Sequence, residues 1–136
     1  MNQSENRITA GVHHVGLTVA ALPEALAFFE DVLGYEKSGE KPDYPAAFVT
    51  DGATMITLWQ AQAAEEAVAF DRHRNIGLHH LALRLTCQAA LDELYERLST
   101  TAGVAIEFAP EPCNDRGARH MMCTIPGGPR LEFRAD

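Results

Sequence analysis

The distribution of apolar residues along the chain predicts two similar units that follow one another. Residues 11–19 and 77–85 are short apolar runs, and each carries a pair of histidines near its start. When the two runs are aligned, His13 and His14 fall on His79 and His80, an offset of 66 residues. A helical pattern and further strand-like runs follow each of them. The chain therefore reads as two copies of one unit.

The first unit is expected over residues 8–60. Residues 8–19 alternate between apolar and polar positions as a half-buried strand does, and His14 falls on the side opposite the apolar set. A helix is predicted from Leu22 to Gly34, since apolar residues recur at helical spacing and glycine suits a left-handed cap. Strands are expected at 35–39, 46–50 and 53–60, the last two joined by a two-residue hairpin turn at positions 51 and 52.

The second unit is expected over residues 77–135, after an alanine-rich and charged connector at 61–76. A strand at 78–85 precedes a helix capped by Thr86 and ending near Gly103. A loop is predicted over 110–117, and strands at 104–108, 118–125 and 130–134. Each unit has the order βαβββ, and together they form one domain over residues 8–136.

Composition narrows the classes of function. The chain has 136 residues, 46% of them hydrophobic, and a net charge of −8. An acidic chain of this kind has no electrostatic reason to bind nucleic acid or anionic membranes. The polar first residues lack an apolar signal core, and the three cysteines form no CxxC pair. A cytoplasmic protein with reduced thiols is the expectation.

Two histidines and one carboxylate are candidates for chemistry. Glu132 lies in the last predicted strand between apolar neighbours, and a carboxylate in that setting is costly unless it is paired or bound to a metal. His14, His80 and Glu132 from separate strands can form the facial set that holds a divalent metal and leaves positions open. The alternative is structural, with Glu132 paired to Arg84 or Arg134.

The order of these pieces resembles the vicinal oxygen chelate superfamily, which includes glyoxalases, bleomycin-resistance proteins and extradiol dioxygenases. The resemblance covers residues 11–134. It is carried by short motifs in matching order: HVGLTV at 14–19, FF at 28–29, LGY at 33–35, HLAL at 80–83, PGG at 126–128 and LEF at 131–133.

The resemblance implies a half-open β-barrel cup of the α+β class around a small cavity. The family's four metal positions fall on His14, Thr57, His80 and Glu132. The Thr57 position is a carboxylate in glyoxalase I-like members, and a threonine hydroxyl cannot act as a general base there. His14, His80 and Glu132 are therefore the predicted ligands of Fe²⁺, Mn²⁺, Zn²⁺ or Ni²⁺. A homodimer, with sites inside one chain or shared between two, is also implied.

Further residues are candidates for the cup. His120 is the candidate catalytic acid or base, because its ordinary pKa lies near neutrality. Thr57, Trp59 and Arg119 are the candidate substrate-binding residues, Trp59 as a stacking wall and Arg119 for an anionic group. The leading function is a metalloenzyme of lyase, isomerase or dioxygenase type that chelates a small oxygenated substrate through two atoms. The alternative is a metal-free protein that binds a small molecule, as bleomycin-resistance proteins do.

Overall fold

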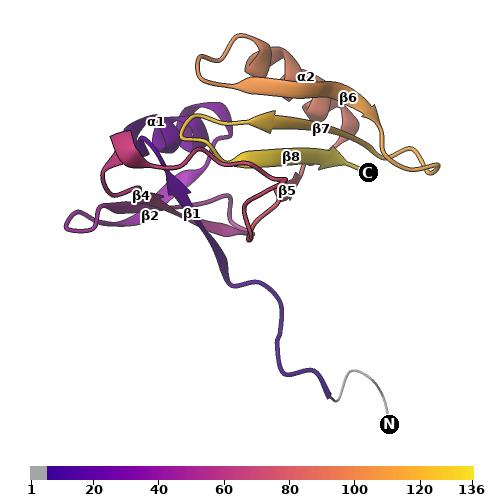
Figure 1. The fold of residues 1–136 in the computed structure, drawn as a ribbon. Coiled ribbons are helices and arrows are strands. Elements are labelled where there is room, and N and C mark those ends of the chain that lie inside the picture. The colour runs from indigo at the N-terminus through magenta and orange to yellow at the C-terminus, as the bar shows by residue number, and fades with distance from the viewer. Residues whose placement is uncertain (1–5) are drawn as a thin grey trace.

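The computed structural model describes residues 6–136 and contains two four-stranded sheets (Figure 1). The first unit comprises β1 (His14–Val19), α1 (Leu22–Ala27), the π-helical turn η2 (Phe28–Val32), β2 (Glu36–Lys41), β3 (Ala46–Thr50) and β4 (Met55–Gln60). A 3₁₀ turn, η3 (Ala64–Glu66), lies in the connector. The second unit comprises β5 (Leu81–Arg84), α2 (Gln88–Ser99), β6 (Ala105–Pro112), β7 (Arg119–Thr124) and β8 (Arg130–Ala135).

The two sheets have the same topology, which confirms the predicted repeat. Their strand orders are β1-β4-β3-β2 and β5-β8-β7-β6, and the first strand of each unit runs parallel to the last. Gly16 on β1 is opposite Thr57, and Ala82 on β5 is opposite Glu132. Since Gly16 and Ala82 differ by the same 66 residues as the histidines, Thr57 is the structural counterpart of Glu132.

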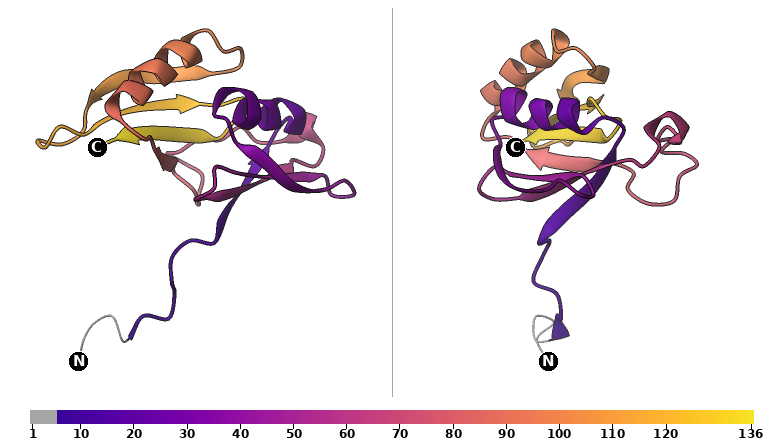
Figure 2. Two further views of the ribbon diagram at one scale, coloured as in Figure 1. Left: turned by 180° about the vertical axis from the view of Figure 1, so that it is seen from behind. Right: turned by 90° about the vertical axis from the view of Figure 1, so that its left-hand side faces the viewer.

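One hydrophobic core joins the two units. Alternate residues of the strands point into it, so that Leu17, Leu58, Leu131 and Phe133 are almost completely buried. Helix α1 covers β3 and β4, while α2 covers β6, β7 and β8. The helical segments meet between the units, where Arg97 Nη1 of α2 donates a hydrogen bond to a carbonyl of η2 (2.8 Å; Figure 2). Within residues 6–136 each helix thus packs on one face of its own sheet, and the opposite faces are the candidate walls of a cup.

The observed strands differ from the predicted ones where pairing partners end. The first strand begins at His14 rather than at residue 8, because β4 offers its first partner, Met55, opposite His14. Residues 6–13 instead form an arm that leaves the body of the molecule (Figure 1). The fifth strand is shorter than predicted, Leu81–Arg84, and β6 is longer, reaching Pro112 through two irregular pairings with β7. Part of the predicted loop at 110–117 is therefore strand.

The helix expected from Leu22 to Gly34 ends where predicted, with Leu33 as its C-cap and a φ of 76° at Gly34, although it becomes π-helical after Ala27. Two other local predictions were wrong. The turn after β3 has four residues rather than two, because Asp51 Oδ1 accepts hydrogen bonds from the amides of residues 53 and 54 (2.9 and 2.7 Å). Cys87 rather than Thr86 occupies the N-cap of α2. Within residues 6–136, none of the helices has the length and apolar character needed to cross a membrane.

Candidate functional site

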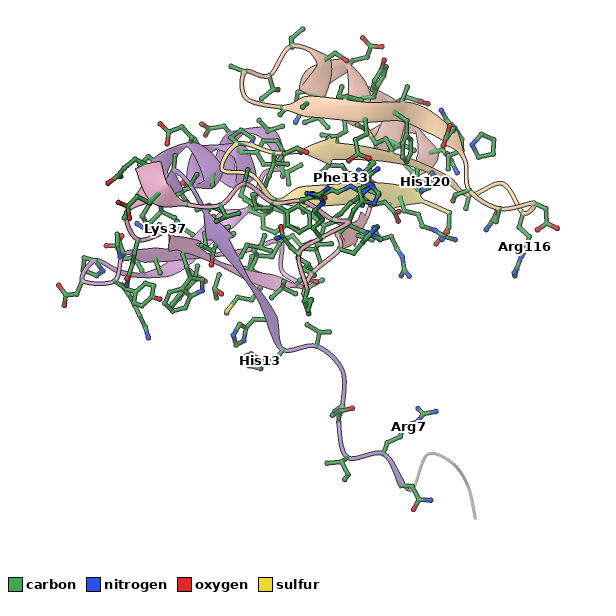
Figure 3. The ribbon with its side chains drawn as sticks, in the orientation of Figure 1. Arg7, His13, Lys37, Arg116, His120 and Phe133 are labelled. Atoms are coloured by element: carbon green, nitrogen blue, oxygen red, sulfur yellow. The ribbon has the colours of Figure 1, made fainter. Side chains whose placement is uncertain are left out.

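The open face of the second sheet gathers a carboxylate and two imidazoles. Leu131 and Phe133 are fully buried in the core, so the alternation of β8 directs Glu132 to the other face, where its side chain is only 14% exposed. His80 Nε2 lies 3.8 Å and His120 Nδ1 lies 3.3 Å from Glu132 Oε1. Figure 3 shows His120 and Phe133 in this part of the second sheet. The carboxylate thus has an imidazole on each of two neighbouring strand segments.

His120 sits between two carboxylates. Its Nδ1 faces Glu132, and its Nε2 lies 3.8 Å from Glu111 Oε1 on β6. The ring also lies near Phe108, with centroids 5.0 Å apart. These contacts fix where the imidazole lies while leaving 22% of its side chain exposed. Sequence analysis missed Glu111 because it predicted the end of the strand at residue 108.

A separate ion-pair network supports the start of β8. Arg130 is almost buried and donates two hydrogen bonds to Glu107, through Nε (2.7 Å) and Nη2 (2.9 Å). Arg72 of the connector donates a further one to the same carboxylate (3.0 Å). The hydrogen bonds from Arg130 hold the pKa of Glu107 below its ordinary value. Arg130 also approaches His79 Nδ1 (3.3 Å), which in turn lies 2.8 Å from His80 Nδ1, so this network reaches the carboxylate–imidazole cluster.

The two arginines proposed as partners of Glu132 in the structural alternative form their ion pairs elsewhere, and Arg134 interacts with Glu132 only at longer range. Arg84 and Arg134 both pair with Asp136 (3.8 and 3.0 Å). Arg119, a candidate substrate-binding residue, faces α2 and forms a two-hydrogen-bond ion pair with Asp92 (2.9 and 3.3 Å). It therefore does not join the cluster around Glu132.

The corresponding face of the first sheet is aromatic. Trp59 donates a hydrogen bond from Nε1 to Thr57 Oγ1 (2.8 Å), and Thr57 is almost completely buried. The Tyr44 and Phe48 rings lie 4.7 and 6.0 Å from the Trp59 ring. Gly16 leaves room for this arrangement, because a Cβ there would lie 3.2 Å from Thr57 Oγ1. Thr57 and Trp59 thus share one face, as the sequence predicts.

His14 is placed in the first unit, away from His80 and Glu132. The far end of β1 touches the second unit, since Ala20 N donates to Gly127 O (2.9 Å) just before β8. His14 is at the opposite end, five residues or roughly 17 Å from Val19. Figure 3 shows its neighbour His13 at the base of the arm, far from His120. Within the described residues 6–136, no three His, Cys, Asp or Glu side chains are arranged to hold a metal ion.

Cys123 does not contribute a nucleophile to this face. All three thiols are free, and Cys123 is fully buried on the core side of β7. Burial raises the pKa of the Cys123 thiol to about 12. A thiolate, the reactive form, is therefore disfavoured at neutral pH.

Comparison with known proteins identifies the family. Residues 11–133 match the profile of the Glyoxalase/Bleomycin resistance protein/Dioxygenase superfamily. The chain belongs to this superfamily. Among its relatives is a 2-epi-5-epi-valiolone epimerase of Actinomyces sp, which is 29% identical over 144 aligned positions that cover 90% of this chain and 77% of the epimerase.

Solved structures of the superfamily share the fold. A glyoxylase/bleomycin resistance protein/dioxygenase domain from Frankia sp. EAN1pec superimposes with a TM-score of 0.79 at 25% identity, covering 93% of this chain and 92% of that one. The fosfomycin resistance protein FosX of Listeria monocytogenes superimposes with a TM-score of 0.73 at 18% identity, covering 95% of both chains. A lactoylglutathione lyase of Agrobacterium tumefaciens gives 0.70 at 23% identity, covering 95% of this chain and 96% of the lyase.

Proposed function

We propose that this chain is a divalent-metal-dependent enzyme that acts on a small substrate with two neighbouring oxygen atoms. His80 and Glu132 of one chain would hold the metal together with His14 of a second copy. The observation that carries this proposal is the setting of Glu132. It is largely buried on the open face of β8, and its ion-pair partners within 4 Å among residues 6–136 are two imidazoles rather than an arginine or lysine.

The donor set fits a divalent metal. Two imidazole nitrogens and one carboxylate oxygen suit Fe²⁺, Mn²⁺, Zn²⁺ and Ni²⁺, and a facial arrangement leaves positions for substrate. A FosX variant of similar fold was crystallised with Mn(II), which agrees with this range. When bound, such an ion supplies a Lewis acid that stabilises negative charge developing on substrate oxygens.

A second copy supplies the missing ligand in this proposal. His14 is exposed in the first unit and is not among the contacts of Glu132, whose ion-pair partners are His80 and His120. Placing the first unit of one chain against the second unit of another closes the cup. It also brings the aromatic face with Trp59 opposite the ionisable face with Glu132. The protein would then be a homodimer with two equivalent shared sites.

The chain's own residues divide the remaining tasks. His120, held between Glu132 and Glu111, would carry a proton to or from the substrate carbon next to the bound oxygen atom. Trp59 and Tyr44 would form the wall that excludes water and orients the substrate. The epimerase relative supports this assignment, because epimerisation by removal and return of a proton requires an acid–base group. Reaction types of the lyase and dioxygenase kinds remain alternatives within the proposal.

Metal content tests the proposal. Native protein purified without chelator should contain about one divalent ion per chain by elemental analysis, and His80→Ala should lose it. His73→Ala is the matched control, because it removes an exposed imidazole of the connector that is not among the proposed ligands. Wild-type protein that takes up none of the four metals, or His80→Ala protein that binds as much as His73→Ala, contradicts the proposal.

Mixing two inactive variants tests whether the site is shared. A mixed dimer of His14→Ala and His80→Ala chains contains one site with all three ligands and one site that lacks two. Refolding the variants together should therefore restore metal binding that neither variant has alone. If each site lies within one chain, mixing restores nothing.

The aromatic face favours a second candidate function. Lys41 Nζ lies 5.7 Å from the Trp59 ring centroid, beside the Tyr44 and Phe48 rings, and such a surface can bind a flat molecule without any metal. A metal-free binding protein would bind its ligand equally with and without chelator. Loss of ligand binding on chelation excludes this candidate.

A further inference from the structure

The exposed apolar residues of the chain fall into two groups. Seven large hydrophobic side chains are exposed within residues 6–136, and only Tyr44 belongs to the aromatic face described above. Two lie on the arm, Ile8 (100% exposed) and Val12 (78%). The other four lie at the end of the connector and the start of the second unit: Val68, Phe70, Ile76 and Leu78.

These four residues line a groove. It has a volume of about 860 Å³ and runs beside His79, His80 and Arg130, with the last residues of β1 on its other wall. Ile76 and Val68 are exposed at 105% and 87%, which is unusual for apolar side chains that line a groove. Because burial of exposed apolar side chains is favourable, such a groove favours an apolar occupant.

The arm, residues 6–13, carries exposed apolar side chains and lies directly before His14. Residues 6–13 leave the body of the molecule and are exposed along their whole length (Figures 1 and 2). Val12 precedes His14 by two residues and therefore points to the same side of an extended chain. Under the proposed function, His14 of one copy meets His80 of the other, and His80 borders the groove. The residues just before His14 are then carried to the groove of the partner copy.

We infer that the arm of each chain, residues 6–13, lies in the groove of a second copy and seals the dimer beside the shared site. Val12 would contact the groove wall next to His80, and Ile8 would reach the part of the groove lined by the connector. The bend at Gly11, with φ of 109°, lets the arm change direction between these two contacts. This inference rests on the proposed dimer, although its test does not require a metal.

Disulfide trapping between two different chains tests the inference. Val12→Cys and Ile76→Cys would be made separately, each in a background with Cys87 and Cys113 replaced by serine; the remaining Cys123 is fully buried. When the two variants are mixed and mildly oxidised, a product of twice the chain mass should form. It should exceed by about tenfold the yield of Val12→Cys mixed with Glu96→Cys, a position exposed on α2.

The trapping results separate the alternatives. Equal yields with the Ile76→Cys and Glu96→Cys partners overturn the inference. So does a double variant, Val12→Cys with Ile76→Cys, that cross-links only within one chain, because the arm would then occupy its own groove. Trapping in a protein that binds no metal refutes the proposed function and leaves the arm exchange standing. A dimer that binds metal but gives no trapped product overturns the arm exchange and leaves the proposed function standing.

Sedimentation provides a second readout. Replacing Ile8 and Val12 together by aspartate should raise the dimer dissociation constant by about tenfold or more, because two buried apolar side chains are lost from each of two contacts. Ile76→Asp should produce a change in the same direction. Glu96→Asp is the matched control and should leave the constant unchanged. An unchanged constant for the arm variant overturns the inference.

Discussion

The two sheets of this protein have the same strand topology and differ in the chemistry of their open faces. At equivalent positions opposite Gly16 and Ala82, the first sheet carries Thr57 and the second carries Glu132. The first face is aromatic and has a tryptophan that is hydrogen-bonded to a threonine. The second face has a carboxylate flanked by His80 and His120.

This difference shows how two copies of one unit can keep the same fold and carry different side chains on their open faces. The buried faces are constrained alike, because both must fill one shared core. The open faces are free of that constraint, so one can carry ionisable groups while the other carries a surface that excludes water. In the proposed dimer, a cup built from one face of each kind would have ionisable groups on one side and an aromatic wall on the other.

The largest expected effect on stability comes from substitutions in the hydrophobic core that the two units share. Leu58→Ala and Phe133→Ala remove fully buried side chains from the first and second units. Each should lower the free energy of unfolding by about 3–5 kcal/mol, through lost burial and the cavity left behind. Since both residues belong to one core, denaturation followed by circular dichroism and by tryptophan fluorescence should give one coincident transition in both variants. Separate transitions for the two probes contradict a shared core.

The second largest effect is on metal affinity, and it should differ between the two open faces. Under the proposed function, Glu132→Gln should weaken metal binding by more than about 100-fold, because it removes the proposed anionic ligand. Thr57→Val at the equivalent position should leave metal affinity within about threefold of wild type. Isothermal titration with Mn²⁺ and Zn²⁺ measures both. Similar losses in the two variants would mean that the faces are not specialised as described.

A third effect concerns the ion-pair network of the second unit. Glu107→Gln should lower the free energy of unfolding by about 2 kcal/mol at neutral pH, because Arg130 is left buried with a weaker partner. The pKa of Glu107 is lowered in the folded state, so its contribution is complete above its unfolded pKa and is lost as pH falls through the folded pKa. The stability difference between wild type and variant should therefore shrink between about pH 5 and about pH 3. Urea denaturation across this range measures it, and a constant difference contradicts the assignment.

The smallest expected effect on stability comes from the hydrogen bond on the aromatic face of the first sheet. Thr57→Val removes the acceptor for Trp59 Nε1 and should cost about 1 kcal/mol of unfolding free energy. Trp59 is the single tryptophan, so its fluorescence reports on this contact directly. The emission spectrum should shift in the Thr57→Val variant and remain unchanged in Glu132→Gln. The reverse pattern would place Trp59 on the other face.

The repeat and the burial pattern could be predicted from the sequence because alternation is a local property. The side of β1 that carries His14, and the buried neighbours of Glu132, follow directly from the period of a strand. The matching places of Thr57 and Glu132, each in the last predicted strand of its unit, also identified them as counterparts. None of these inferences depends on how the two sheets are placed.

The ends of elements and long-range partners could not be predicted in this way. The first strand begins where Met55 becomes available as a partner, which is decided by a segment about forty residues away. Glu111 joins His120 only because irregular pairing prolongs β6. Arg119 pairs with Asp92 because its position on β7 points toward α2, a direction that the sequence alone left open. The position of His14 relative to Glu132 depends on the arrangement of the units, and the three-ligand set stays a prediction.

The contact at Gly127 determines what can be exchanged between molecules. With φ of 97° and its Cα so close to Val19 that an added Cβ would come within 2.9 Å, this glycine fastens the end of β1 to the turn before β8. Neither unit can be released from its own chain without breaking this junction. In the proposed dimer, labelled and unlabelled protein should accordingly mix by exchange of whole folded subunits, at a rate set by dissociation of the dimer and independent of unfolding.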